Sequence, residues 1–590
     1  MNGVSDRAAQ WGIEVEHWDG LGRHWTVEPL VLERLLEAIA PKNEPHPLAA
    51  LPDSPGRAYQ GGETLPPRAW VVVVQLYGVR SRRNWGHGDF TDLANLIDIA
   101  SSLGAAGIGL NPLHALFDDH PEEVSPYFPS SRFFLNPLYI DIEAIPEFPR
   151  SALADVQSHI DAARKQDFVG YTYVTKAKIQ ALALAYENFR THGTDARRQQ
   201  FDEFLRERGP MLASFAAFEL LRRRFGTPWW EWPKEWQRPD ENALARLRAT
   251  EADQLDYFKF VQWIAHQQLA ACRDKANRLG LPIGLYLDLA VGVRSDGFDA
   301  WDDQDFVLRT IEMGAPADRL NTQGQCWGLA GFNPSSLING NCEPFRKVLR
   351  ASMRYAGTIR LDHVLGLNRY YFIPRGLRAD QGAYVRFPFE ALLAAAAHES
   401  VANKCIVIGE DLGTVPPTFR EMLAKWGIWS FQVMLFERAA DGGFIAPDLY
   451  RENALVTFGT HDLPTFAGWN SGHDLITKRN LGLDPGESDS ERAAARDAMG
   501  RAMAWRGLSA MEYFSTVRFL AETPSRLLAV TMEDALGMVE QVNVPGTIAE
   551  HPNWRRRLPV QLEELLERSS LSAIADLMAA AGRRTGDRLA

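Results

Sequence analysis

Eight short apolar runs that are typical of buried β-strands recur along this chain, and they constrain its fold more than any other feature. The run from Trp70 to Val74 is continuously apolar, as expected of a parallel strand covered on both faces. A helical pattern that begins at Asp89 or Thr91 and ends near Gly104 separates it from the next run, so the three predict a parallel strand–helix–strand unit. The full set of expected strands is 70–77, 107–110, 283–290, 357–362, 405–410, 431–436, 455–460 and 527–532.

Eight parallel strands alternating with helices predict an α/β fold, the (β/α)8 barrel, whose active site lies at the carboxyl ends of the strands. Residues 1–67 are expected to form a mostly helical appendage with a proline-rich linker, and residues 68–590 the barrel. Two insertions in the barrel are expected: a loop and helical subdomain at about 111–270, and a lid-like loop at about 312–345. The four tryptophans within 227–236 are interpreted as packing the helical subdomain onto the barrel, with sugar platforms as the alternative.

Composition narrows the classes of function. The formal net charge of −12 argues against nucleic acid as a partner, because nucleic-acid binding requires a basic face. The 11% share of aromatic residues fits either a ligand that stacks on flat rings or a large aromatic core. The four cysteines form no CxxC pair, so neither a zinc site nor a redox motif is expected, and a reducing cytoplasm is the default location. The first residues do not resemble a signal peptide, and the longest strand-like apolar run is too short to span a membrane.

Three of the expected strands end on acidic residues. Asp362, Glu410 and Asp462 each lie at or just beyond the end of an apolar run. The carboxyl ends of parallel barrel strands meet on one face, so these acids are expected to gather there. Arg360 precedes Asp362 by two residues, and residues two apart on a strand share a face, so the two side chains should point the same way.

This combination of residues fits a retaining glycosyl transfer. Such a reaction needs two carboxyl groups about 5–5.5 Å apart, one that attacks the anomeric carbon and one that shuttles a proton. The attacking group must be ionised, and the cation of Arg360 favours that form of Asp362. The proton shuttle must begin protonated, and Glu410 follows an apolar run and neighbours other acids, both of which raise its pKa. A third carboxylate, Asp462, would stabilise an oxocarbenium-like centre.

Other interpretations of the same residues remain open. An aspartate at a strand end is more often a helix N-cap, as Asp411 would be before the stretch that follows it. His461 and Asp462 would serve as ligands in a metal-dependent hydrolase, although that class usually needs histidine clusters and residues 75–77, at the first strand end, include no histidine. A glucan-binding protein without activity is a third possibility, against which the presence of all three acids argues.

The order and spacing of several motifs resemble the 4-α-glucanotransferase family, also called amylomaltase or disproportionating enzyme. The motifs are spread from about residue 70 to about residue 570, so the resemblance covers nearly the whole chain, and the N-terminal piece resembles the extra segment of the longer bacterial members. The motifs are SPYFPSSRFFLNPLYID, QCWGL, RLDH, DQGAYV, VIGEDLGTVP, FGTHDLPT, QVNVPGT and PNWRRRLP.

The resemblance implies an α-amylase-type barrel that moves segments of 1,4-α-glucan between acceptors, with maltooligosaccharides and 1,4-α-glucans as partners and no metal or cofactor. A plain α-glucan hydrolase is the closest alternative. The resemblance implies Asp362 as the nucleophile, Glu410 as the general acid/base and Asp462 as the stabiliser of the transition state. The remaining residues expected to bind substrate are Arg360, His363, His461, Asp288, Tyr77 and Trp327.

The sequence context bears on four of these residues. His363 and His461 match neighbours that bind sugar hydroxyls, and the alternative is that both are core histidines bonded to backbone. Asp288 falls where the family has an aspartate at the end of its third strand, but YLDLA replaces the GDLP or GDMP of many members. Trp327 lies in a glycine-rich segment that resembles the family's lid over the acceptor side, where its ring could stack on a sugar.

Overall fold

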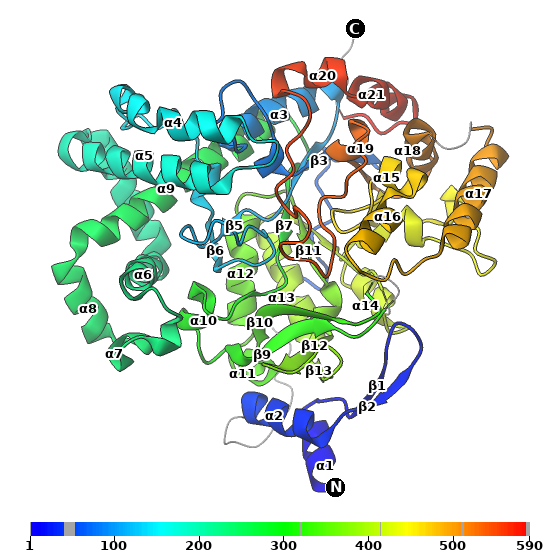
Figure 1. The fold of residues 1–590 in the computed structure, drawn as a ribbon, viewed down its shortest axis with the longest axis horizontal. Coiled ribbons are helices and arrows are strands. Elements are labelled where there is room, and N and C mark those ends of the chain that lie inside the picture. The colour runs from blue at the N-terminus through cyan, green and yellow to red at the C-terminus, as the bar shows by residue number, and fades with distance from the viewer. Residues whose placement is uncertain (1, 41–53, 319–320, 414, 509–511, 586–590) are drawn as a thin grey trace.

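The computed structural model describes residues 2–40, 54–318, 321–413, 415–508 and 512–585 (Figure 1). Its centre is an eight-stranded parallel sheet in the order β14-β11-β7-β4-β3-β17-β16-β15. A parallel bridge between Ile408 and Trp429 joins the two outer strands and closes the barrel. All eight expected strands are confirmed: β3 (Ala69–Val74), β4 (Gly107–Leu110), β7 (Gly284–Leu289), β11 (Thr358–Leu361), β14 (Ile406–Gly409), β15 (Ser430–Val433), β16 (Ala454–Thr457) and β17 (Leu527–Thr531).

The two faces of β3 explain why its sequence is continuously apolar. Val71 packs in the cluster that fills the barrel interior, together with Ile408 and Phe431 from other strands. Its neighbours Val72 and Val74 point the other way, into the larger core between the barrel and its helices. A strand buried on both sides has no solvated face, so alternation of apolar and polar residues is lost.

The helix that follows β3 shows how local sequence signals set its ends. α3 (Phe90–Leu103) begins at Asp89, whose carboxylate accepts hydrogen bonds from the backbone N–H groups of Thr91 and Asp92 in a capping box. Of the two residues at which this helix was expected to begin, Asp89 is therefore the one that caps it. α3 ends at Gly104, whose φ of 71° lies in the left-handed region that glycine tolerates best.

The first insertion contains the predicted helical subdomain, which lies on one side of the barrel in cyan and green (Figure 1). Its long helices are α4 (Leu153–Arg164), α5 (Tyr171–His192), α6 (Asp195–Phe225), α8 (Glu241–Thr250) and α9 (Ala252–Arg278). Two of the four tryptophans within 227–236 are buried against neighbouring segments, in line with the packing role expected of them. Trp229 is buried and its indole N–H donates to the Ser295 carbonyl at 3.0 Å, and the buried ring of Trp232 lies 6.3 Å from that of Trp301.

The expectation of a lid-like loop at about 312–345 is wrong, because most of this segment forms strands and helices. It supplies the end of β9 (Val307–Ala315), all of β10 (Gln325–Phe332), α11 (Pro334–Asn339) and the start of α12 (Glu343–Met353), while residues 319 and 320 lie outside the described residues. Gly328 and Gly331, taken as loop signals, lie at two irregularities in the register between β9 and β10. Glycine in a strand marks such bulges, so glycine content alone misidentified the segment.

β9 and β10 belong to a second, five-stranded antiparallel sheet with the order β13-β12-β9-β10-β8. The other members are β8 (Val293–Arg294), β12 (Arg369–Pro374) and β13 (Ala383–Arg386), so two segments that follow barrel strands β7 and β11 combine in one sheet. Tyr370 and Phe372 on β12 stack with ring centroids 5.9 Å apart. This sheet places β10 beside the carboxyl end of β11.

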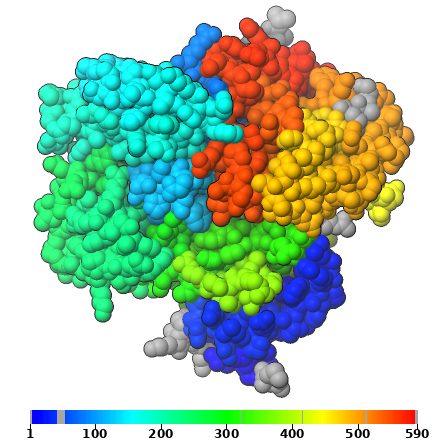
Figure 2. All heavy atoms as spheres, viewed as in Figure 1, coloured from blue at the N-terminus to red at the C-terminus, as the bar shows by residue number. Residues whose placement is uncertain are grey.

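The N-terminal piece contains α1 (Asn2–Gln10), α2 (Pro29–Ile39) and a hairpin of β1 (Glu16–Trp18) and β2 (His24–Thr26), in blue in Figure 2. It docks on the second sheet, where Ile13 forms a bridge with Val385 and the Glu14 N–H donates to the Tyr384 carbonyl at 2.8 Å. Residues 41–53, in the expected proline-rich linker, lie outside the described residues. Across the described ranges, no helix combines the length and the apolarity needed to cross a membrane.

Candidate active site

The three acids lie at the carboxyl ends of barrel strands, as expected. Asp362 directly follows β11, and its N–H donates to the Leu289 carbonyl at 3.3 Å. Glu410 directly follows β14, and its N–H donates to the Leu361 carbonyl at 3.0 Å. Because β11 and β14 are hydrogen-bonded neighbours, these two acids lie side by side. Asp462 lies in the loop after β16.

Arg360 holds two carboxylates together. One guanidinium nitrogen lies 2.9 Å from Asp362 Oδ1, and another donates to both oxygens of Asp288 at 2.8 Å. The strand register explains the second contact, since Arg360 on β11 lies directly opposite Asp288 on β7. The prediction that Arg360 and Asp362 share a face is therefore confirmed, and Asp288 joins them despite its unusual sequence context.

The two neighbouring acids have pKa values that differ in the direction required for acid–base chemistry. Burial raises the pKa of Asp362 to about 6, and the Arg360 cation limits that rise. Burial raises the pKa of Glu410 to about 8; Arg360 opposes this rise and the Asp362 carboxylate adds to it. At neutral pH, Asp362 is therefore mostly ionised and Glu410 mostly protonated. This arrangement matches a nucleophile beside a proton donor.

Glu410 is also fixed by backbone groups. Its two oxygens accept hydrogen bonds from the N–H groups of His363, at 2.9 Å, and Leu412, at 3.0 Å. His363 reaches this position with a φ of 47°, in the left-handed region that is uncommon for residues other than glycine. Its ring lies 5.3 Å from that of Trp327, edge to face, and burial lowers its pKa to about 4, so the ring is neutral. His363 therefore orients the acid through its backbone while its ring faces Trp327 on β10.

Asp462 has different surroundings. Its side chain is 45% exposed, lies 3.3 Å from His461 Nε2 and accepts a hydrogen bond of 2.6 Å from the Asn543 amide. Burial by itself would raise its pKa, but His461 and the amide hold the pKa of this carboxyl below its ordinary value, while the carboxylate raises the pKa of His461. The Gln541 amide donates to the Asp462 carbonyl at 2.8 Å. Asp462 is thus a fixed anion near neutral pH.

Several residues at the site were not singled out from the sequence. The Tyr127 hydroxyl donates to Asp288 at 2.5 Å and lies 3.3 Å from His461 Nδ1, and its ring stacks on His461 with centroids 4.7 Å apart. The Trp554 ring lies 5.3 Å from both rings. Tyr127 lies in SPYF, Gln541 and Asn543 in QVN, and Trp554 in PNW. These motifs were recognised, but nothing in a single sequence indicates which barrel strands such loops approach.

The segment between α19 (Met532–Ala535) and α20 (Leu565–Arg568) carries these amides and Trp554. In Figure 1 it descends in orange-red across the front of the barrel toward β11. Two cavities open at this end of the barrel. The first is lined by residues including Gln75, Tyr127, Asp288, Arg360, His461 and Glu533, and the second by residues including Arg132, Phe332, Asp362, His363 and Tyr370. Polar groups with aromatic walls are suited to hold a sugar ring.

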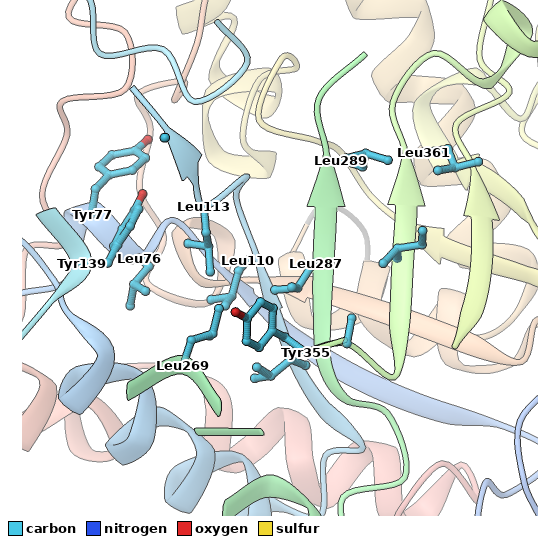
Figure 3. Close-up of a cluster of buried hydrophobic side chains, with 14 of the residues drawn as sticks. Leu76, Tyr77, Leu110, Leu113, Tyr139, Leu269, Leu287, Leu289, Tyr355 and Leu361 are labelled. Carbon is cyan, nitrogen blue, oxygen red and sulfur yellow. The ribbon is translucent and has the colours of Figure 1, made fainter. Parts of the chain in front are cut away.

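Tyr77, expected to bind substrate, lies apart from this group. It is 2% exposed in the short helix after β3, and Figure 3 shows it beside Tyr139 in a cluster with Leu76 and Leu113. Within the described ranges, its hydroxyl has no hydrogen-bond partner. No group of three His, Cys, Asp or Glu side chains that could hold a metal ion occurs among the described residues.

Comparisons with known proteins agree with this geometry. The sequence profile of a family described as 4-alpha-glucanotransferase, glycoside hydrolase family 77, matches residues 74–563. The 4-alpha-glucanotransferase of Mycobacterium tuberculosis (strain H37Rv) is 37% identical over an alignment of 550 residues, and the match covers 87% of this chain and 75% of that protein. The protein of the same name from Haemophilus influenzae is 35% identical over an alignment of 560 residues, and the match covers 88% of this chain and 79% of that protein.

Two solved structures share the fold. Amylomaltase from Corynebacterium glutamicum has a TM-score of 0.84 at 26% identity and covers 98% of this chain and 99% of its own. Amylomaltase from Streptococcus agalactiae, in complex with acarbose, has a TM-score of 0.69 at 21% identity, and the match covers 88% of this chain and 100% of that chain. Since the profile spans most of the chain and two relatives exceed 30% identity, the chain belongs to the 4-α-glucanotransferase family, retaining enzymes that transfer segments of 1,4-α-glucan.

Proposed function

We propose that Asp362, Glu410 and Asp462 carry out the double displacement of this family. The observation that carries the proposal is the pair of acids directly after β11 and β14, in which a buried acid with a pKa of about 8 lies beside one with a pKa of about 6. A retaining transfer needs one ionised carboxylate and one carboxylic acid at the same bond, and this pair supplies both near neutral pH.

In the first half of the reaction, Asp362 attacks the anomeric carbon of the donor glucan. The bond from that carbon to the glycosidic oxygen breaks, and Glu410 gives its proton to the departing oxygen. The product is a covalent glucosyl ester of Asp362 with an ionised Glu410. Positive charge builds up on the ring during this step, and we propose that Asp462, which contacts His461 and Asn543, stabilises that charge.

In the second half, the 4-hydroxyl of an acceptor glucose or glucan attacks the same carbon. Glu410 takes its proton, the ester bond breaks and Asp362 regains its charge. The Asp288–Arg360 pair holds Asp362 in place throughout, and Tyr127 fixes Asp288 from the other side. We propose maltooligosaccharides and 1,4-α-glucans as both donors and acceptors.

Transfer requires that an acceptor reach the ester before water does. Water is present at about 55 M, so the acceptor must be bound and water displaced. Trp327 is part-buried on β10 and lies edge to face with the His363 ring, next to the acid/base. We propose that Trp327 forms the acceptor side of the cleft. Family membership favours a transferase over the α-glucan hydrolase that was the alternative.

The test is the product ladder from pure maltotriose. A transferase yields glucose together with oligosaccharides longer than the substrate, with no net gain in reducing ends. Products that are all shorter than maltotriose would refute the proposal. A cytoplasmic location is also proposed, because all four cysteines are free thiols, three of them buried, as in a reducing compartment.

A further inference from the structure

A pair of arginines beside a tryptophan lies outside the catalytic cleft and has no assigned role. The Arg309 guanidinium lies 5.1 Å from the Trp230 ring centroid and 5.6 Å from that of Trp229, and the Arg375 guanidinium lies 5.6 Å from Trp230. These side chains line neither of the two cavities at the end of the barrel. We refer to Trp230, Arg309 and Arg375 as the arginine–tryptophan cluster.

The cluster carries a positive charge that its neighbours leave unbalanced. Arg375 pairs with Glu312 at 3.2 Å and donates to the Ser295 hydroxyl. Within the described ranges, the Arg309 guanidinium has neither an ion pair nor a hydrogen bond, and its contacts are the two indole rings. Two cations therefore share one carboxylate. Both guanidinium groups lie against the Trp230 ring, and burial together with the Arg375 charge lowers the pKa of Arg309.

The positions of these side chains are set by secondary structure. Arg309 lies on β9, and the Arg375 N–H donates to the Thr310 carbonyl of β9 at 3.0 Å, which places Arg375 alongside that strand. Trp229 is buried and anchored by its hydrogen bond to Ser295. The part-buried Trp230 follows it, with the rings 5.4 Å apart. The strand, the backbone contact and the anchored Trp229 therefore set where the two part-buried arginines lie.

An unpaired guanidinium beside a second one is suited to a single phosphate group, which accepts paired N–H donors from arginine. A part-exposed indole next to a phosphate site gives an apolar surface for a sugar ring. The formal net charge of −12 repels extended polyanions such as nucleic acid. We propose that the arginine–tryptophan cluster binds the phosphate monoester of a sugar, with the phosphate on Arg309 and Arg375 and the sugar against Trp230.

The experiment is calorimetric titration of the full chain at low ionic strength with glucose 1-phosphate, glucose 6-phosphate, inorganic phosphate and glucose. Saturable binding of both sugar phosphates, tighter than that of inorganic phosphate, is expected. Arg309→Gln keeps a planar polar group but removes the charge, so it should weaken this binding at least about tenfold. Arg378→Gln removes an exposed arginine from the segment between β12 and β13 and is the matched control, with no change expected.

The arms separate the alternatives. A sugar phosphate that binds in the catalytic cleft instead would bind equally well to the wild type and to Arg309→Gln, and this result would overturn the proposal. The absence of saturable binding to the wild type would also overturn it. Binding of inorganic phosphate as tight as that of both sugar phosphates would overturn the role of the sugar and of Trp230. Arg309→Gln should retain wild-type disproportionation of maltotriose in phosphate-free buffer, which verifies that the variant is folded.

Discussion

The pH dependence of the reaction provides a quantitative test of the assigned roles. The active form has Asp362 ionised and Glu410 protonated, with pKa values of about 6 and about 8. Raising the pH through 6 charges Asp362 and increases activity, and raising it through 8 removes the Glu410 proton and decreases activity. About 80% of molecules are in the active form at pH 7 and about 10% at pH 5 or pH 9. kcat/KM should therefore follow a bell centred near pH 7.

Glu410→Gln identifies the group behind the alkaline limb. The amide cannot donate a proton to a departing sugar, so turnover of maltotriose should fall by about 10²–10⁴, or about 2.7–5.5 kcal/mol in barrier height. A maltosyl fluoride donor has a leaving group that needs no proton. It should still form the glycosyl-enzyme in the variant, with a rate that rises through pH 6 and stays level above it.

The assay is initial-rate measurement from pH 4.5 to 9.5 at constant ionic strength, with intact mass of the protein to detect the glycosyl-enzyme. The same alkaline limb in Glu410→Gln with the fluoride would refute the role of Glu410. A wild-type profile that is flat between pH 5 and pH 9 would refute the pKa order itself. Asp411→Asn is the contrasting variant at the neighbouring acid. Asp411 accepts hydrogen bonds from the Phe431 N–H and from Arg420, so it should not account for the alkaline limb.

Three further predictions concern single residues. Asp362→Asn removes the attacking charge but keeps the shape, so transfer should fall by orders of magnitude while glucan binding persists; a variant with a tenth of wild-type activity would contradict the assignment. Trp327→Ala should raise the ratio of hydrolysis to transfer, measured as new reducing ends against longer oligomers from maltotriose, and an unchanged ratio would remove its acceptor role. Asp89→Ala loses the capping box of α3 and an ion pair with Arg83, so the free energy of unfolding measured by urea denaturation should fall by about 1–2 kcal/mol. The control is Asp489→Ala at an exposed position of α17 (Asp489–Trp505), which should change that free energy by less than about 0.5 kcal/mol.

The sequence alone determined the barrel and the place of three acids at its strand ends. Strands buried on both faces are continuously apolar, so β3 and the other seven barrel strands could be recognised from short apolar runs in the sequence. Acids at the ends of such strands meet on one face, which predicted that Asp362, Glu410 and Asp462 lie close together. The contact of Arg360 with Asp362 also followed from local geometry, because the period of a strand is two residues.

The tertiary structure decided what depends on contacts between distant segments. Tyr127 and Asn543 lie in loops that are far apart in the sequence. Only folding brings Tyr127 into contact with Asp288 and Asn543 into contact with Asp462. β10 looked like a loop because its glycines are local signals, whereas its strand form depends on pairing with β9. The order of the two pKa values also depends on burial, which no residue type specifies by itself. Local periodicity is encoded residue by residue, but desolvation and long-range contacts belong to the folded chain as a whole.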